Sequence, residues 1–289
     1  MKRPLRTSHD KREHDERMKD SALLERRLDV ASEALDRGDP VTTLDVCAQI
    51  LRDHPRQVDA LYLQATALAD LGDLVSAEEQ LRYIALHHPA HSQAWSSLAC
   101  IQFDQFRHTE SYNASLRAIQ ASPHNPEAFY ARALLRERRG DFDGAQRDYQ
   151  RAHRLDGQEF PPPITLTDAD MKELIEETVA EMHPSIRTYL GQVPILVEEI
   201  PAEELCLQYE PPAAPSEILG YYAGTPLPDR CLEEPWSNLP AAVVLFRRNI
   251  ARMSTQRKAL LDELRSTVFR EVGHFLGLTQ EDLSPREER

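Results

Sequence analysis

The chain has no apolar run long enough to cross a membrane and no excess of positive charge. A membrane-spanning helix needs about 20 consecutive apolar residues, and no segment of the 289-residue sequence offers them. Lys and Arg number 34 against 48 Asp and Glu, so the formal net charge is −14. Phosphate backbones and anionic lipids bind clustered Lys and Arg. We therefore expect neither a nucleic-acid partner nor a membrane partner.

Cysteine is also scarce, and its spacing excludes two common uses. The chain has Cys47, Cys100, Cys206 and Cys231, far apart from one another. A zinc ribbon needs Cys-x-x-Cys pairs, and a disulfide-stabilised domain concentrates several cysteines in a short chain. Residues 1–20 also lack the apolar core of a signal peptide. These features predict ordinary thiols in a reducing compartment, and we expect a cytoplasmic protein.

Large apolar residues are nearly absent from 1–20, where both signs of charge alternate. Such a segment buries too little apolar surface to offset the entropy lost on ordering. We therefore predict a disordered charged tail over 1–20 and a short tail over 285–289. The length between them is sufficient for two domains that each bury a core.

Residues 21–157 repeat with a period of 34. Small or helix-breaking residues recur at this interval. The prolines are Pro55, Pro89 and Pro123, the alanines are Ala31, Ala65, Ala99 and Ala133, and the glycines are Gly38, Gly72 and Gly140. In the third unit Phe106 stands in place of the glycine. Small side chains let two antiparallel helices approach closely, glycine takes the turn between them, and proline ends the second helix. The segment resembles the tetratricopeptide repeat, with about four units.

This resemblance implies an α-helical solenoid whose concave face binds an extended peptide or a helix. We predict a protein or peptide partner on this face. On the family's register the groove would include Tyr62, Thr66, Ser96, Phe103, Tyr130 and Leu134. The Lys, Asn and Arg set with which chaperone-binding members hold a carboxylate is missing. The alternative is that the repeats only pack against the second domain.

Residues 158–165 contain three consecutive prolines, which cannot continue a helix and predict a Pro-rich linker. A second domain then follows over 166–284. Thr167 is placed to cap a helix that runs to Met182. Aliphatic and aromatic runs predict strands over 193–198, 218–222 and 241–247, and a long helix starts near Ser254. This order predicts a small α+β domain in which a short sheet packs against two principal helices.

The last helix carries a motif that lacks one residue of a zinc site. In His-Glu-x-x-His, two histidines one turn apart hold zinc and the glutamate acts as general base. Here Arg270 occupies the first histidine position, while Glu271 and His274 keep theirs. A guanidinium has no lone pair to donate. Arg270 therefore cannot be a zinc ligand.

Four segments occur in the order of the zincin-like metallopeptidases with a minimal matrix-metalloproteinase-like domain, which they resemble: VPILVEEIPAEEL, ILGYYAGTPL, LPAAVVLFRRNI and LRSTVFREVGHFLGLTQEDL. The resemblance implies Glu271 as the general base, here a remnant, and His274 as a metal ligand. It also implies a third ligand, usually Asp or His, where this chain has Gln280. Two of three expected ligands are thus replaced, and we expect no cofactor.

Two functions from different classes remain open. The first is a pseudoenzyme that acts as a protein-interaction adaptor through its repeats and its degenerate peptidase fold. The second is an active zinc-dependent peptidase with Glu271 as general base and ligands recruited from elsewhere, for example Glu281, Asp282 or His183. Loss at two ligand positions favours the first. The second is supported by retention of Glu271, Gly273, His274 and Gly277.

Overall fold

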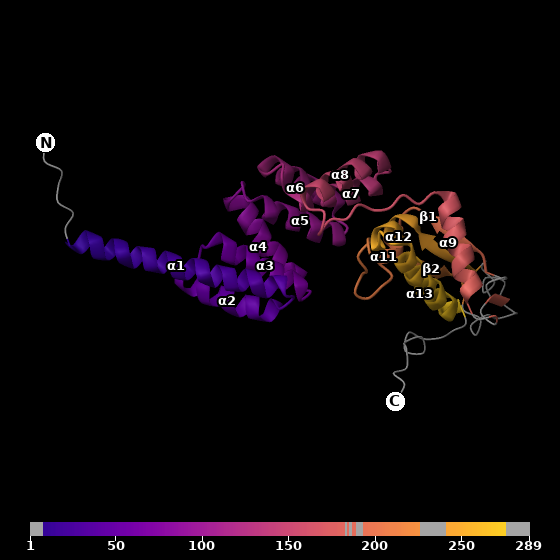
Figure 1. Cartoon of the computed structure of the whole chain (residues 1–289), viewed down its shortest axis with the longest axis horizontal. Helices are drawn as coiled ribbons and strands as arrows, with labels where there is room; N and C mark the ends of the chain where they lie inside the picture. Colours follow the sequence, from indigo (N-terminus) through magenta and orange to yellow (C-terminus); the bar gives the residue numbers. More distant parts are fainter. Residues whose placement is uncertain (1–7, 183, 185–186, 189–192, 226–240, 276–289) are drawn as a thin grey trace, which may run out of the picture. The chain divides into compact units, whose positions relative to one another are not determined.

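The computed structural model describes residues 8–182, 184, 187–188, 193–225 and 241–275 (Figure 1). Its contacts divide the chain into two compact units. The first comprises residues up to 103 together with 108–131, and the second comprises 104–107 together with 132 onward. The division by contacts thus falls inside two helices of the repeats, between 103 and 104 and between 131 and 132, rather than at the linker. The domain boundaries expected from the sequence stay a prediction.

The predicted helical repeats are confirmed as consecutive helix pairs (Figure 1). From α3 onward each pair occupies one 34-residue period, whereas α1 is longer, and the turn between the two helices of a pair is short. The helices are α1 (Ser8–Asp36), α2 (Pro40–Asp53), α3 (Val58–Asp70), α4 (Leu74–His87), α5 (Ser92–Asp104), α6 (His108–Ala121), α7 (Pro126–Arg138) and α8 (Phe142–Leu155).

The turns inside the pairs follow one chemical scheme. Gly38, Gly72 and Gly140 have φ angles of 72°, 83° and 74°, a backbone region in which a side chain is strained. The aspartate that follows each glycine caps the next helix by accepting a backbone N–H three residues on. The alanines of the repeat are fully buried, as close helix packing requires. Phe106 takes the glycine's place with φ 60°.

The expectation of disorder over 1–20 is wrong for residues 8–20, which belong to helix α1. Apolar content was the wrong criterion for this segment. Opposite charges recur four residues apart along 11–19, and this spacing stabilises a helix without any apolar face. The segment also contains neither glycine nor proline. The first turns of α1 therefore extend the helix of the first repeat toward the N-terminus.

The second unit contains the predicted small α+β domain. Its three described strands form one sheet in the order β1-β3-β2, with β1 parallel and β2 antiparallel to β3. Thr167 caps α9 through a capping box with Asp170. The elements are α9 (Asp168–Glu181), β1 (Ile195–Glu198), α11 (Glu203–Cys206), β2 (Gly220–Ala223), β3 (Ala242–Phe246), α12 (Arg247–Met253) and α13 (Arg257–Phe275).

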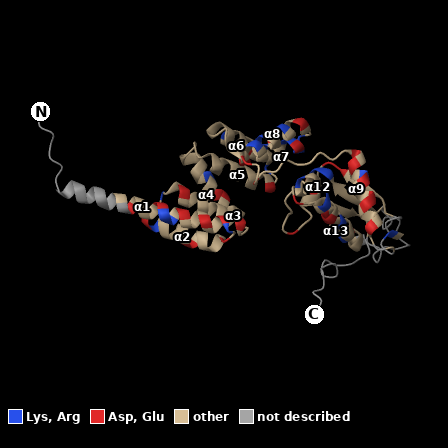
Figure 2. Cartoon of the chain, viewed as in Figure 1, with Lys and Arg blue, Asp and Glu red and all other residues tan. Residues whose placement is uncertain are grey.

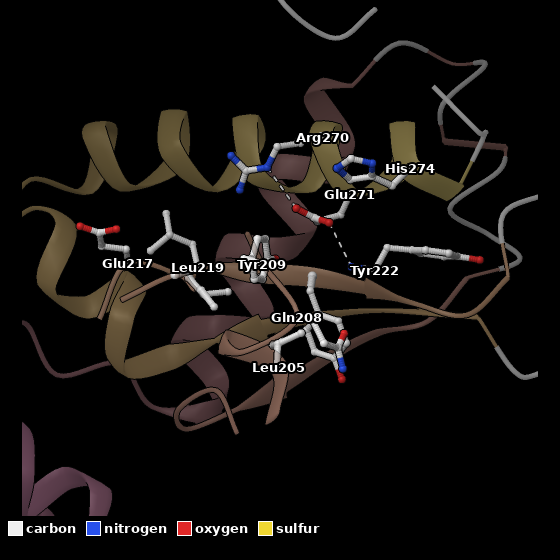
Figure 3. A pocket seen from close by; sticks show the side chains of 13 residues that line it. Leu205, Gln208, Tyr209, Glu217, Leu219, Tyr222, Arg270, Glu271 and His274 are labelled. Carbon is white, nitrogen blue, oxygen red and sulfur yellow. Dashed lines mark hydrogen bonds and ion pairs between the residues drawn. The ribbon is translucent and has the colours of Figure 1, made fainter. Parts of the chain in front are cut away.

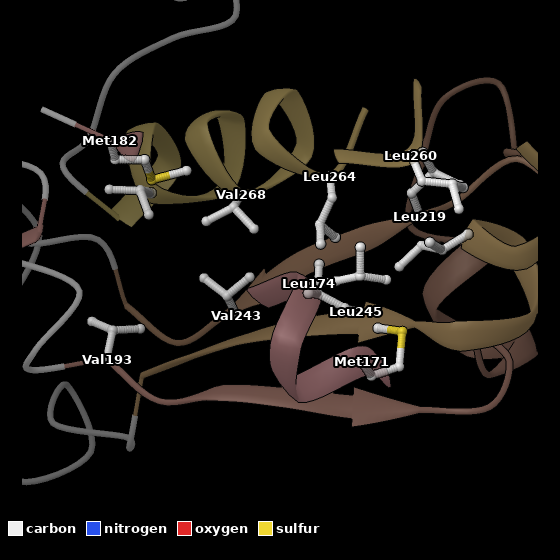
Figure 4. Close-up of a cluster of buried hydrophobic side chains, with 12 residues drawn as sticks. Met171, Leu174, Met182, Val193, Leu219, Val243, Leu245, Leu260, Leu264 and Val268 are labelled. Atoms are coloured by element: carbon white, nitrogen blue, oxygen red, sulfur yellow. The ribbon is translucent and has the colours of Figure 1, made fainter. Parts of the chain in front are cut away.

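The main core of this domain lies between one face of the sheet and the two long helices, α9 and α13 (Figure 4). Met171 and Leu174 of α9 and Leu264 and Val268 of α13 meet Val243 of β3 there. The helices are also joined by charge. Figure 2 shows acidic residues along α9 and basic residues on α12 and α13; they form the pairs Arg247–Asp168, Arg257–Glu173, Arg257–Glu177 and Arg265–Glu181. In the described part of the chain, no helix is long and apolar enough to span a bilayer.

Two substitutions of Phe106 test whether the turn depends on its positive φ, because glycine should destabilise the chain less than alanine there. We expect Phe106→Ala to lower the free energy of unfolding by about 2 kcal/mol, since the ring packs beside Cys206 and Ile218 and is only partly buried. Phe106→Gly should be less destabilising than Phe106→Ala by about 1 kcal/mol, because glycine adopts the positive φ without strain. Urea denaturation measures both.

The matched control is Gly72→Ala. An added Cβ there meets no atom within 4 Å, so the loss of about 1 kcal/mol should come from the backbone alone. If Phe106→Gly were the more destabilising substitution at 106, the turn would not depend on the left-handed backbone.

Candidate functional site

The candidate site is held by the C-terminal half of α13. Buried residues recur every fourth position along this helix, at Leu260, Leu264, Val268 and Val272, and fix it against the core. Glu271 lies next to Val272 of this stripe and is itself buried. Its side chain therefore points toward the sheet, about one helical turn before His274, which lies near the C-terminal end of α13.

Both carboxylate oxygens of Glu271 are already hydrogen-bonded (Figure 3). The backbone N–H of Tyr222 in β2 donates to Oε2 over 3.0 Å, and Nε–H of Arg270 donates to Oε1 over 3.1 Å. The Glu271 side chain is 7% exposed, whereas that of Arg270 is 42% exposed. These two residues thus form an ion pair within α13, and the hydrogen bond from Tyr222 joins this helix to β2.

Burial is the largest influence on the titration of Glu271 and raises the pKa of its carboxyl above the ordinary value. The hydrogen bond and charge of Arg270, the charge of His274 and the Tyr222 N–H act in the opposite direction. Burial likewise raises the pKa of the Tyr209 hydroxyl, and the Glu271 carboxylate adds to that rise. The carboxylate of Glu271 is therefore tolerated because Arg270 and Tyr222 stabilise it.

A pocket of about 510 Å³ opens beside Glu271 (Figure 3). Its volume lies in the range of small-ligand and peptide side-chain sites. Strand β2 forms one wall and α13 another, and a third comes from the segment around α11. Residues that line it include Leu205, Gln208, Tyr209, Glu217, Tyr222 and His274. Aromatic, amide and charged groups therefore converge on one concave surface.

The residues described around this pocket do not fit a zinc ion. Position 270 offers a guanidinium, and its Nε hydrogen is used on Glu271. Within the described ranges, no group of three or more His, Cys, Asp or Glu side chains is arranged to hold a metal. Gln280, Glu281, Asp282 and His183 lie outside the described residues. Of the motif positions, the described residues thus supply one imidazole, His274, and one carboxylate, Glu271, that already has two donors.

Comparison with known proteins places this domain. Residues 190–289 match the family model described as Zincin-like metallopeptidase. This match identifies the C-terminal domain as zincin-like. This confirms the predicted zincin-like domain, which follows a helical repeat region. No curated protein matches the chain.

Solved structures resemble the repeat region. MamA from Desulfovibrio magneticus is 20% identical with a TM-score of 0.39, over 46% of this chain and 76% of that one. A thermophilic TPR protein of Thermus thermophilus is 17% identical with a TM-score of 0.43, over 46% and 75%. PilF of Pseudomonas aeruginosa is 17% identical with a TM-score of 0.43, over 47% and 62%. At such values these likenesses carry no argument about function.

The six residues expected in the repeat groove divide into two sets. Tyr62, Thr66 and Tyr130 are half-buried, so they remain candidates for a partner surface. Ser96, Phe103 and Leu134 are buried, and we correct their expected role. The Ser96 hydroxyl donates to Glu127 and accepts from the Asn125 amide. The Ser96 hydroxyl therefore makes contacts between neighbouring repeats. The repeat register alone could not distinguish such a contact from an exposed groove position.

Sequence reasoning missed the backbone donor Tyr222 and the lining residue Tyr209. The segment with two adjacent tyrosines had been recognised only as a strand, and a backbone N–H leaves no signal in side-chain identity. Tyr209 follows the short helix α11 and reaches the pocket only because the chain folds back over the sheet. Neither position belongs to a spacing motif.

The Arg270–Glu271 pair can be tested with a double-mutant cycle. We expect Arg270→Met to lower the free energy of unfolding by about 1 kcal/mol, because it leaves a buried carboxylate oxygen without this donor. In a Glu271→Gln background the same change should cost less, which gives a coupling of about 1 kcal/mol in urea denaturation.

Arg265→Met is the matched control for that cycle. Arg265 also lies on α13, is similarly exposed, and pairs with the exposed Glu181. Surface pairs contribute about 0.5 kcal/mol or less. Equal losses for Arg265→Met and Arg270→Met, without coupling to Glu271, would contradict a structural role for the pair.

Asp104 predicts a pH dependence of stability. Burial, and secondarily the charge of Glu217 at the pocket, raise the pKa of the Asp104 carboxyl to about 6. Because the folded-state pKa lies above the unfolded value, the folded chain binds this proton more tightly. The contribution of Asp104 to the free energy of unfolding is therefore full below about pH 4 and is lost as the pH rises through about 6.

Asp104→Asn should raise the free energy of unfolding at pH 7 by about 1 to 2 kcal/mol and flatten the decline between pH 4 and pH 7. Glu217→Gln removes only the weaker of the two causes and should have a smaller effect in the same direction. Chemical denaturation across this pH range measures both. A stability lost rather than gained in Asp104→Asn at pH 7 would show that the charged form is favoured.

Proposed function

We propose that this zincin-like protein with tetratricopeptide repeats is a catalytically impaired, protein-interaction adaptor whose peptidase-like domain retains a peptide pocket. The observation that carries the proposal is the hydrogen bond from Arg270 to Glu271. A residue that should supply a metal ligand instead supplies a cation, and it holds the residue that should act as base. Both losses follow from one substitution.

The chemistry of the pair supports impairment. A general base needs a lone pair directed at the proton that it removes. Each oxygen of Glu271 already accepts one hydrogen bond, from Arg270 or from the Tyr222 N–H, and both bonds lower the pKa of the carboxyl and so its strength as a base. A guanidinium beside the site would also raise the free energy of placing a divalent cation there by several kcal/mol, on the order of what a charge pair is worth at low effective dielectric. One imidazole does not offset this.

The pocket keeps features that suit an extended peptide. In the described sheet, β2 pairs with β3 on one side only, so it forms an edge. Peptides add to sheet edges through backbone hydrogen bonds, and neighbouring pockets select their side chains. Gly220, Tyr221 and Tyr222 of this edge line the pocket. A peptide laid along β2 would therefore place a side chain beside Tyr209 and His274.

The repeats supply a second candidate surface. Tyr62, Thr66 and Tyr130 remain partly accessible on α3 and α7. Aromatic and hydroxyl side chains of this kind bind peptides without requiring a charged terminus. An adaptor of this design would hold one protein partner on the repeats and a second segment in the pocket.

The alternative function is an active zinc-dependent peptidase that uses Glu271 as general base. It is favoured by the retention of Glu271 and His274 together at the pocket. It requires ligands from Glu281, Asp282 or His183 in place of Arg270 and Gln280.

Metal content distinguishes the two functions. We expect elemental analysis of the purified, tag-free chain to find far less than one zinc per molecule after zinc supplementation, with no further loss in His274→Ala. About one zinc per chain that is lost in His274→Ala would overturn the adaptor proposal. In that event peptide cleavage should be assayed with Glu271→Gln as the inactive control.

Reversal of the two substitutions provides the complementary test. Arg270→His with Gln280→Asp should rebuild a three-ligand set and bind about one zinc per chain. Arg270→His alone is the matched control and should bind zinc weakly, because one ligand position would still hold Gln280. Equal zinc content in the single and double variants would show that position 280 supplies no ligand.

A further inference from the structure

The second compact unit contains a buried ion pair that joins the last repeat to the zincin-like domain. Arg252 of α12 pairs with Glu137 of α7, and these side chains are 9% and 4% exposed. The hydroxyl of Tyr149 in α8 donates to the same carboxylate over 3.0 Å. Arg252 also lies 3.4 Å from that hydroxyl. Helices α7 and α8 of the last repeat and α12 of the zincin-like domain thus share one buried charge cluster.

The hydrogen bonds continue from Arg252 to the wall of the pocket. Arg252 donates to the side-chain oxygen of Asn249, which is itself 1% exposed. The Asn249 amide nitrogen then donates to the carbonyl of Pro215 over 2.9 Å and to that of Ile218 over 2.6 Å. Residues 213 and 217–222 line the pocket. One chain of side-chain contacts therefore runs from α7 to the segment that precedes β2.

Apolar and stacking contacts accompany this network. Phe106, in the turn before α6, packs against Ile218, Val244 and Phe246 on the face of the sheet opposite to α9 and α13. The guanidinium of Arg248 lies over the ring of Phe142 at 4.2 Å. Arg138 donates to the carbonyl of Pro201. The turn before α6 thus contacts the sheet, and the last repeat contacts α12 and the segment before α11.

The free-energy cost of burying charges indicates that this cluster is not an incidental contact. A buried carboxylate without a partner is strongly destabilising, and loss of one member of a buried pair costs far more than loss of a surface pair. Glu137 and Arg252 lie 115 positions apart, and their pairing lowers the free energy of keeping both charges buried. The sequences of the last repeat and of α12 therefore depend on each other.

We propose that the last repeat, α7 with α8, is a covering layer of the zincin-like domain, and that Arg252 is a positioning residue that orders the 213–219 wall of the pocket through Asn249. This inference holds whether or not the pocket binds a peptide. It assigns the docked surface of the last repeat to an intramolecular partner. A protein partner would then use the earlier repeats, which carry Tyr62 and Thr66 but not Tyr130.

Amide hydrogen exchange on the full-length chain tests the proposal. Arg252→Met should accelerate exchange over 216–220 and over α7 and α8 by about a hundredfold, because it leaves Glu137 buried without its partner and removes the donor to Asn249. The Glu217 N–H, which donates to the Ala214 carbonyl, is a suitable probe. Exchange in α9, on the opposite face of the sheet, should stay within about threefold of the parent.

Arg257→Met is the matched control, since Arg257 pairs with exposed Glu173 and Glu177 on α9. It should leave exchange over 216–220 unchanged. Unaltered exchange over 216–220 in Arg252→Met would overturn the proposal directly.

A second variant separates positioning from simple stability. Glu137→Met with Arg252→Met removes both buried charges, and such replacements are often neutral or stabilising. We expect the midpoint of urea denaturation to recover, while exchange over 216–220 remains fast because Asn249 still lacks its donor. If recovery of the midpoint restored slow exchange over 216–220 as well, Arg252 would stabilise the interface without positioning the pocket wall.

Discussion

The strand β3 must be covered on both faces, and this requirement organises the second half of the molecule. All five of its residues are buried. Val243 and Leu245 face α9 and α13, while Val244 and Phe246 face a cluster that includes Cys206 and Phe106. A central strand with two apolar faces cannot leave either one to solvent. A short domain with two long helices has enough surface for one face only, so the turn before α6 helps to cover the other.

The candidate site is a consequence of the same packing. The apolar stripe that presses α13 onto the sheet brings Glu271 against the backbone of β2, where the Tyr222 N–H meets it. In that place a carboxylate needs a second donor, because burial disfavours its charge. Arg270 supplies that donor. The arginine that stands at a ligand position of the motif therefore also stabilises the carboxylate of Glu271.

In the repeats, too, residues that differ from a simple repeat pattern make tertiary contacts. Ser96 and Asn125 bond to each other between neighbouring helix pairs instead of facing a groove. Phe106 retains the left-handed backbone of the glycine that it replaces, and its ring serves the second unit. Departures from the repeat consensus are thus found where a residue has a tertiary contact to make.

The sequence by itself determined the period of 34, the glycine turns, the capped helix after Thr167 and the degenerate motif on the last helix, because each depends on residues close together in the chain. It misjudged 8–20, where charge spacing rather than apolar content favours a helix. Only the tertiary structure decided which register residues are buried, that Tyr222 and Tyr209 join the site, and that Glu137 pairs with Arg252. A backbone donor has no side-chain signature, and partners more than a hundred positions apart have no shared spacing, so folding alone brings them together.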